Sequence, residues 1–295
     1  MTGKFLSKLR LKNQLARECL AEFLGTFILL TFGTASVAQK VLSDGDNGSA
    51  LSIHWSWGIG VTLGIYVAGG VSGAHLNPAV TIALACLGKC PWKKTPVYML
   101  AQYLGAFIAS ACVYLVYIDA LKHHDNGVRV IDGVTGTAGI WSTYPTSYVS
   151  TWNCFGDQIF STAILLLCIL AITDTNNMQP TKGVLAISVG LLVVAIGMTF
   201  GHNCGYAINP ARDLGPRLFT SVAGWGKAPF SYRDYNYFWV PVVGPHLGGI
   251  LGALVYQLCV GMHWPEDEKI ISVQNMGEKS KLEYDGPYSE SNTQL

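Results

Sequence analysis

Charged residues are scarce in this 295-residue chain. They make up 13% of the sequence, against about 25% in typical soluble domains. Of the 37 charged residues (19 Lys and Arg, 18 Asp and Glu), 6 lie in residues 1–19 and 10 in residues 263–295, so 21 remain among the 243 residues between. That stretch has too few charges to solvate a globular surface. The composition argues against a soluble enzyme, and a net charge of +1 with no basic patch argues against a nucleic-acid partner.

A metal-binding cysteine pattern is also missing. The chain has eight cysteines, most of them inside apolar runs, and no pair has C-x-x-C spacing. Cys86 and Cys90 are four residues apart, but two small residues packed in a membrane helix explain that spacing better than a metal site does. No nucleophile–base pair is visible either. We therefore expect no metal, no cofactor and no catalysed reaction.

Long apolar runs are abundant instead. A bilayer core of roughly 30 Å needs about 20 apolar residues per helix, and six runs meet that length. Two further runs, residues 78–87 and 210–223, are too short to cross, and each begins with a proline, which suits the first turn of a helix. Such half-length helices must be buried in protein or line a cavity. The six predicted spans are residues 16–39, 53–71, 96–117, 154–173, 184–200 and 238–262.

Positive charges predict the orientation in the membrane. Five lie in the N-terminal tail, and Lys89, Lys93 and Lys94 follow the first short helix, while the alternate side has fewer. The positive-inside rule then places both termini in the cytoplasm of a multi-pass protein, which we expect in the plasma membrane. Asn47 begins an Asn-Gly-Ser sequon in the first loop, on the predicted outer face. It is a candidate glycosylation site, and an ordinary Asn-Gly turn is the alternative.

The sequence contains an internal repeat. Residues 22–30 align with residues 158–166 at an offset of 136, and residues 73–79 align with residues 205–211 at an offset of 132. Each half therefore has three spans and one short helix in the same order. Because three is odd, the second half enters the membrane from the opposite face, which makes an inverted repeat. The predicted fold is an all-α membrane protein with six transmembrane helices and two re-entrant half-helices.

Both short helices begin with the tripeptide Asn-Pro-Ala, at Asn77, Pro78 and Ala79 and again at Asn209, Pro210 and Ala211. One copy alone indicates a capped helix start, but two copies at matching places in an inverted repeat are a strong signal. A helix N-terminus carries free N–H groups and about half a positive charge. Two such ends meeting near the midplane repel cations and protons but admit neutral solutes with lone pairs.

The loops before these tripeptides are rich in glycine. Residues 69–73 and 201–205 can run extended and offer backbone carbonyls to a pore whose other wall remains apolar. Such a lining suits small polar or polyhydroxylated neutral solutes. The backbone expected to line the pore belongs to Gly73, Ala74, His75, Leu76, Cys204 and Gly205.

Over residues 16–262 the chain resembles the aquaporin (major intrinsic protein) family, specifically its aquaglyceroporin, or glycerol facilitator-like, branch. The most specific matches are residues 72–80, SGAHLNPAV, and residues 205–213, GYAINPARD. Asp213 indicates the branch, because water-only members usually lack an aspartate after the arginine of the second motif. The resemblance also implies a homotetramer with one pore per subunit.

The resemblance further implies a selectivity filter on the outer side of the two tripeptides. Counting from them, its positions fall on Trp57, Gly197, Tyr206 and Arg212. Arg212 would offer a rigid fork of donors to two neighbouring hydroxyls of a solute. Trp57 and Tyr206 would form an apolar corner for the carbon backbone of a polyol. We expect Gly197 to widen the pore where the resemblance implies a histidine in water-selective members.

Three polar residues are expected to brace the re-entrant loops. Glu22 and Gln158 occupy equivalent repeat positions, where the family implies a carboxylate that accepts backbone N–H groups. Glutamine departs from that pattern, and its amide oxygen accepts more weakly than a charged group. Asp213, next to the filter arginine, is the third.

Together these features predict a passive, bidirectional membrane channel for glycerol, water and other small neutral solutes that excludes ions and protons. Its expected partners are these solutes and the lipid bilayer. A strict water channel is the nearest alternative, disfavoured by Gly197 and Asp213. A secondary transporter also uses inverted repeats, but the spans offer few ionisable groups apart from Glu22. A membrane enzyme is the third alternative and lacks the residue pairs noted above.

The predicted domain organisation has three parts. Residues 1–15 form a cytoplasmic tail, residues 16–262 form the channel domain, and residues 263–295 form a second cytoplasmic tail. Within the channel domain, the two inverted repeats cover approximately residues 16–118 and 153–262.

Overall fold

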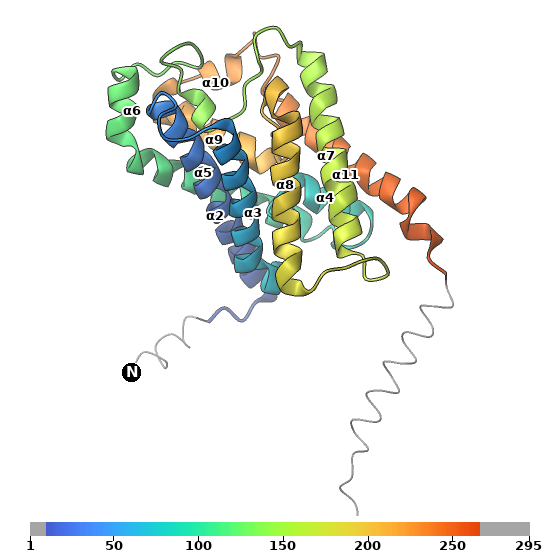
Figure 1. Cartoon of the computed structure of the whole chain (residues 1–295). Helices are drawn as coiled ribbons and strands as arrows, with labels where there is room; N and C mark the ends of the chain where they lie inside the picture. Colours follow the sequence, from blue (N-terminus) through green and yellow to red (C-terminus); the bar gives the residue numbers. More distant parts are fainter. Residues whose placement is uncertain (1–9, 266–295) are drawn as a thin grey trace, which may run out of the picture. The chain divides into compact units, whose positions relative to one another are not determined.

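The computed structural model describes residues 10–265. Lys4 and Lys8 of the N-terminal positive cluster, and the acidic C-terminal stretch from Glu266 onward, lie outside the described residues. Every regular element between residues 10 and 265 is a helix, as the sequence predicts (Figure 1). The long helices are α2 (Gln14–Leu42), α3 (Ala50–Ser72), α5 (Thr95–Val116), α7 (Thr151–Thr173), α8 (Lys182–Cys204) and α11 (Val240–Cys259). The two expected half-helices are α4 (Pro78–Cys86) and α9 (Pro210–Thr220).

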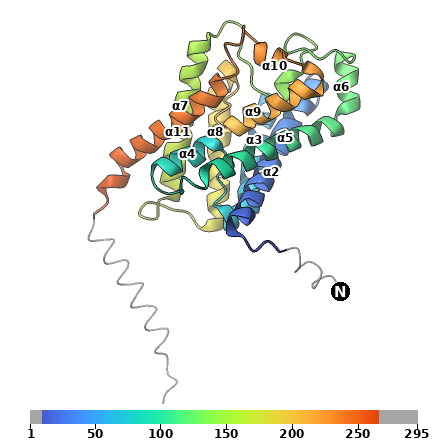
Figure 2. The same ribbon diagram turned by 180° about the vertical axis from the view of Figure 1, so that it is seen from behind.

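The described part of the chain divides into two units, with the division between Tyr256 and Gln257. In the first unit, the order of α2, α3, α4 and α5 is repeated by α7, α8, α9 and α11 up to residue 256, with the short helix third in each half. Both views show α4 and α9 among the long helices (Figures 1 and 2). In the second unit, a 3-10 turn, Gly261–His263, follows the end of α11.

Five described helices are long and apolar enough to cross a membrane: α2, α5, α7, α8 and the segment from α11 to His263. Helix α3 has 23 residues, so it is also long enough, but it is not among the five that meet the apolar criterion, and its first turns carry Ser52, His54 and Ser56. Length therefore agrees with six spans, and five of them also meet the apolar criterion. The polar residues of α3 include one that reaches the site described below.

Glycines let the long helices approach one another closely. A Cβ on Gly60 or Gly64 of α3 would lie 3.0 Å or 2.7 Å from a backbone carbonyl oxygen of α2. Gly248 and Gly252 of α11 lie in the same way against backbone carbonyls of α7. Both pairs have G-x-x-x-G spacing, which allows two backbones to pack with no side chain between them.

Several short elements were not predicted from the sequence. They are α6 (Ile118–Asp125), a 3-10 turn (Ala138–Ile140), a π-helical turn (Ser221–Trp225) directly after α9, and α10 (Ala228–Ser231). An aromatic cluster links two of these segments, because the Trp141 ring lies 5.2 Å from the Trp225 ring and 6.1 Å from the Phe219 ring, centroid to centroid. This packing fixes the segment around Trp141, which contacts the site.

Candidate functional site

The two Asn-Pro-Ala turns meet and bond to each other. Asn77 and Asn209 cap α4 and α9, with each Oδ1 accepting a backbone N–H of the first helical turn at 2.8 Å and 3.0 Å. Asn77 then donates its Nδ2 to the Ile208 carbonyl oxygen at 2.9 Å. Asn209 donates its Nδ2 to the Leu76 carbonyl oxygen, also at 2.9 Å. These reciprocal bonds hold the N-termini of the two half-helices together.

The loops that lead into these turns have a strained backbone. Three residues in each loop have a left-handed φ, namely Gly73, Ala74, Leu76, Gly205, Tyr206 and Ile208, with values of 87°, 52°, 53°, 77°, 34° and 42°. The second set lies 132 positions after the first, so the two loops share one conformation. Such a conformation costs on the order of 1–3 kcal/mol for each non-glycine residue. The surrounding structure must therefore hold the loops in place.

Glu22 supplies that support in the first half. Its carboxylate is fully buried and accepts the backbone N–H groups of His75 and Leu76 at 2.9 Å and 2.8 Å. The Ser72 hydroxyl donates at 2.5 Å, and Gln102 Nε2 donates at 2.8 Å. Hydrogen bonds to an ionised group are roughly twice as strong as neutral ones. Four donors on one carboxylate can therefore offset the strain in this loop.

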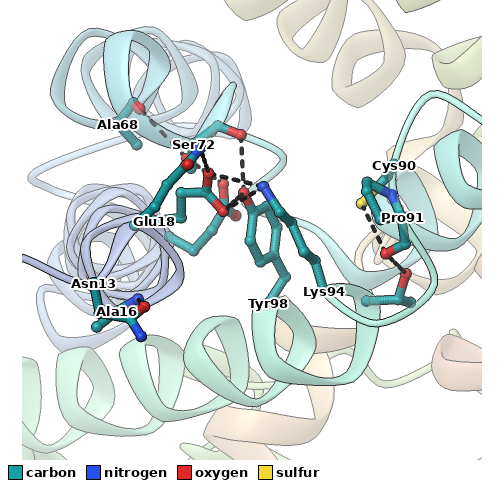
Figure 3. A network of polar contacts seen from close by, with 12 residues as sticks. Asn13, Ala16, Glu18, Ala68, Ser72, Cys90, Pro91, Lys94 and Tyr98 are labelled. Carbon is teal, nitrogen blue, oxygen red and sulfur yellow. Dashed lines mark hydrogen bonds and ion pairs between the residues drawn. The ribbon is translucent and has the colours of Figure 1, made fainter.

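A second buried carboxylate, which the sequence analysis did not single out, lies one turn earlier on α2. Glu18 pairs with Lys94 Nζ at 2.8 Å and accepts from the Tyr98 hydroxyl at 3.0 Å (Figure 3). That hydroxyl also lies 3.4 Å from the carbonyl oxygen of Ser72, whose side chain bonds to Glu22. The network extends the support of the loop to α5. A spacing of four residues between Glu18 and Glu22 in an apolar run was the signal that could have found it.

Gln158 supports the second loop with fewer bonds. Its Oε1 accepts the Ile208 N–H at 2.9 Å, as Glu22 does for the matching residue of the first loop. Its Nε2 donates to Cys204 Sγ at 3.2 Å. Cys204 lies 132 positions after Ser72 and is its equivalent in the second repeat. The direction of the bond is reversed between the two repeats: the Ser72 hydroxyl donates to a carboxylate, whereas the Cys204 sulfur accepts from an amide. The glutamine suits a sulfur neighbour that needs a donor.

A cavity of about 350 Å³ runs along both loops. Its lining includes the residues of the two loops and their Asn caps, with Arg212 of α9: Gly73, Ala74, His75, Leu76, Asn77, Tyr206, Ala207, Ile208, Asn209 and Arg212. Aliphatic side chains of α3, α7 and α8 also line it, at Val61, Ile65, Leu165, Ile169, Leu185, Val189 and Val193. The lining thus combines hydrogen-bonding groups from the loops with apolar groups from the long helices.

Trp57, Tyr206 and Arg212 come together in this cavity, and each is at most 8% exposed. The guanidinium carbon of Arg212 lies 4.1 Å from the centroid of the Trp57 ring. Arg212 Nη1 donates to the Trp141 carbonyl oxygen at 2.8 Å. A cation stacked on an indole and tied to a backbone carbonyl keeps one orientation. This geometry gives the cavity one fixed cationic donor beside two aromatic rings.

Comparison with known proteins agrees with this architecture. The family profile of the major intrinsic proteins matches residues 10–256. The chain belongs to the major intrinsic protein family. The resemblance to aquaporins is thereby confirmed.

Its relatives in this family are aquaporins. Aquaporin-10 of Milnesium tardigradum is 53% identical over 268 residues, covering 87% of this chain and 66% of that protein, just under two thirds of its length. Human Aquaporin-9 is 44% identical over 275 residues, covering 93% of each chain. The crystal structure of the aquaglyceroporin from Plasmodium falciparum superposes with a TM-score of 0.76 at 36% identity, covering 83% of this chain and 97% of that one.

In this major intrinsic protein, Gly197 has surroundings different from those expected. A Cβ at Gly197 would lie 2.8 Å from His54 Nδ1 and 2.9 Å from Tyr206 Cζ. The room left by the missing side chain is therefore occupied by two rings, and Gly197 is not among the residues that line the cavity. That Gly197 widens the pore stays a prediction; in the structure the missing side chain makes room for the Tyr206 ring, which lines the cavity.

Two residues expected to line the pore through their backbone, Cys204 and Gly205, are also absent from the cavity lining. Cys204 is fully buried, and its carbonyl oxygen lies 3.5 Å from the Tyr237 hydroxyl. It contacts the loop support rather than the cavity because α8 continues to this residue and ends there. The carbonyls of a helix end point along the helix and not sideways into a channel.

Asp213 braces a segment other than the re-entrant loop. Its Oδ2 accepts from the backbone N–H and the hydroxyl of Thr143, at 2.8 Å and 2.6 Å. Its Oδ1 accepts from Arg217 Nε at 2.7 Å, and Arg217 Nη2 donates to the Thr143 carbonyl oxygen at 2.7 Å. The same segment carries Trp141, whose carbonyl holds Arg212. The buried Asp213–Arg217 pair therefore holds the Trp141–Thr143 segment in place, and the Trp141 carbonyl of that segment orients Arg212.

Tyr144 covers this ion pair. The Arg217 guanidinium carbon lies 4.6 Å from the centroid of the Tyr144 ring. Burial raises the pKa of Tyr144 to about 12, so the phenol stays neutral beside the pair. Sequence reasoning missed Thr143, Tyr144 and Arg217, and the spacing of four residues between Asp213 and Arg217 was the available signal.

Asn47 lies exposed in the turn between α2 and α3, where its backbone N–H donates to Ser43 Oγ at 2.9 Å. Within residues 10–265, no group of three or more His, Cys, Asp or Glu side chains is arranged to hold a metal ion.

Proposed function

We propose that this protein is a passive, bidirectional channel for glycerol, water and other small neutral solutes, and that it catalyses no reaction. The main support for the proposal is that the cavity has a polar and an apolar side, because loop residues and aliphatic residues of the long helices line the same space. A polyol has hydroxyls along one edge and carbon along the other. Its hydroxyls can exchange water for loop groups at small net cost, while its carbon edge stays in apolar contact. Similarity to an aquaglyceroporin supports glycerol as a solute.

Trp57, Tyr206 and Arg212 are proposed as the selectivity filter, with Gly197 behind Tyr206. The two rings offer carbon surface, and the guanidinium offers fork-shaped donors to adjacent hydroxyls. Because Arg212 is held by Trp141 and stacked on Trp57, its donors need no reorganisation when a solute arrives. A linear polyol passes in single file past this group.

Ions are proposed to be excluded by charge and by desolvation. The N-termini of α4 and α9 meet at the paired asparagines and carry the positive ends of two helix dipoles. Arg212 adds a full positive charge in the same cavity. A cation or hydronium ion would have to lose water opposite these positive groups, whereas a neutral solute meets only hydrogen-bonding partners.

The setting of the channel is proposed as follows. Apolar helices and family membership make it an integral membrane protein. We propose a plasma-membrane location, cytoplasmic termini, a homotetramer with one pore per subunit, and a glycan at Asn47. The proposed organisation remains a channel domain of residues 16–262 with flanking tails and two inverted repeats.

Transport in liposomes tests the proposal. Purified protein is reconstituted, and vesicle volume is followed by stopped-flow light scattering after mixing with hyperosmotic glycerol. A glycerol channel gives rapid shrinkage followed by re-swelling, and protein-free liposomes re-swell slowly. Shrinkage with re-swelling no faster than in protein-free liposomes would indicate a strict water channel. Uptake that saturates and requires a proton or sodium gradient would indicate a transporter.

A further inference from the structure

His54, on α3, is a polar residue that the proposed mechanism does not use. It is partly buried and lies three residues before Trp57, so the two side chains lie on one face of the helix. His54 itself is not among the residues that line the cavity. Its Nδ1 lies 2.9 Å from the Tyr206 hydroxyl, and the two ring centroids are 5.3 Å apart at an interplanar angle of 59°. His54 therefore contacts Tyr206 of the proposed selectivity filter, here called the constriction (Trp57, Tyr206 and Arg212), without lining the cavity itself.

Helix α8 has a notch at Gly197 and Gly201, where the missing side chains leave room for the rings of His54 and Tyr206. Gly197 and Gly201 lie one turn apart, and each is within contact distance of both rings. A Cβ on Gly201 would lie 3.1 Å from His54 Cε1 and 3.2 Å from Tyr206 Cδ1. A Cβ on Gly197 would be closer still, at 2.8 Å from His54 Nδ1. The notch in α8 thus holds a hydrogen-bonded pair of rings rather than Tyr206 alone.

The Tyr206 hydroxyl needs such a partner. Tyr206 is 8% exposed, and His54 is the one hydrogen-bond partner found for its hydroxyl within residues 10–265. A buried hydroxyl without a partner costs about 1–3 kcal/mol, so without His54 the ring gains by turning its oxygen toward the cavity. That movement would narrow the passage between Tyr206 and Arg212 and would hinder a polyol more than a water molecule.

We propose that His54 is a positioning residue that sets the glycerol-to-water selectivity of the channel by holding the Tyr206 ring back in the α8 notch. This inference rests on the proposed function, because it assigns a specificity role at the same constriction. His54 touches no solute. It acts through the bond to the Tyr206 hydroxyl, and this bond keeps the aperture open.

The test uses the full-length protein in liposomes and measures glycerol and water permeability in the same preparation. His54→Leu removes the bond at similar side-chain volume, and we expect the glycerol-to-water permeability ratio to fall about two- to tenfold, the range that one net hydrogen bond allows. His54→Asn places an amide near the position of Nδ1, and we expect it to restore most of the ratio. In a Tyr206→Phe background no hydroxyl remains to be held, so adding His54→Leu should change the ratio little.

The outcomes separate the two levels of the argument. If the unmodified channel conducts water but no glycerol, the proposed function fails and this inference fails with it. If the unmodified channel conducts glycerol and His54→Leu keeps the same ratio, the inference alone is overturned. An equal fall in the Tyr206→Phe background would also overturn it, because the effect would then not pass through the hydroxyl. Should His54→Leu not reach the membrane, His54→Ser replaces it, since serine is too short to reach the hydroxyl.

Discussion

Replacing Gly197 by alanine is the sharpest perturbation of the constriction. The new methyl group would lie 2.8 Å from His54 Nδ1, 2.9 Å from Tyr206 Cζ and 3.0 Å from the Tyr206 hydroxyl oxygen. Ordinary carbon contacts are about 3.5–4.0 Å, so the rings must move by several tenths of an ångström or more. His54 and Tyr206 cannot both keep their positions and their bond. Because Tyr206 borders the cavity, we expect its ring to shift into the passage.

The size of the effect follows from this overlap. Overpacking by one methyl group in a well-packed region costs typically about 1–3 kcal/mol. If the cost falls on the solute-conducting conformation, glycerol permeability should drop about five- to one-hundredfold, since about 1.4 kcal/mol corresponds to a factor of ten. Water is smaller, so its permeability should drop much less. A histidine at the same position would demand still more room and should nearly abolish glycerol flux.

Two alanine substitutions on other glycines serve for comparison, Gly201→Ala as a milder version of the same change and Gly156→Ala as the control. Gly201→Ala meets the same rings at 3.1–3.2 Å, so its effect on glycerol should have the same sign and a smaller size. Gly156→Ala, on α7, has no heavy atom within 4 Å of the new Cβ and should leave both permeabilities unchanged. The assay is stopped-flow light scattering of liposomes that contain equal amounts of each variant. A Gly197→Ala channel with the glycerol-to-water ratio of the unmodified protein would refute the reasoning.

Three further substitutions test the supports of the two re-entrant loops and of the Trp141–Thr143 segment, each by thermal unfolding in detergent. Glu22→Gln replaces a carboxylate that accepts four hydrogen bonds and should lower the free energy of unfolding by about 2–4 kcal/mol. An unchanged melting temperature would show that the strained loop needs no charged acceptor. Gln158→Glu should destabilise at pH 7, since Asp157 Oδ1 lies 3.4 Å from Gln158 Nε2 and two carboxylates would repel; this loss should shrink at acidic pH. Arg217→Lys cannot reproduce the planar fork and should cost about 1–3 kcal/mol, with increased proton leak as Arg212 loosens.

Much of the fold follows from local sequence patterns. Length and hydropathy of the apolar runs predict the long helices within a few residues, because a membrane helix satisfies its backbone groups within its own segment. The starts of α4 and α9 are predicted well, since Asn caps and Pro at the first helical position act within one turn. The short elements after α5 and α9 were missed, because aromatic packing from distant segments and not local pattern maintains them.

The paired replacement in the second half illustrates what the sequence alone could not interpret. Read singly, Gln158 is a weaker version of Glu22, and Cys204 is an ordinary buried thiol. In the structure the two side chains are hydrogen-bonded to each other, at positions 46 residues apart. The second repeat therefore has Cys204 and Gln158 where the first has Ser72 and Glu22. Each pair of side chains is joined by a hydrogen bond, with donor and acceptor exchanged between the two repeats.

The sequence by itself determined the membrane class, the inverted repeat, the two capped half-helices and the residue types around the cavity. These features depend on composition, helix period and short-range capping, all of which are determined by residues close together in the sequence. Only the tertiary structure decided what occupies the space beside Gly197, which carbonyl holds Arg212, and which side chain holds the Tyr206 hydroxyl. The contacts that hold Arg212 and the Tyr206 hydroxyl join residues that are 71 and 152 positions apart, and such contacts are set by the packing of whole helices.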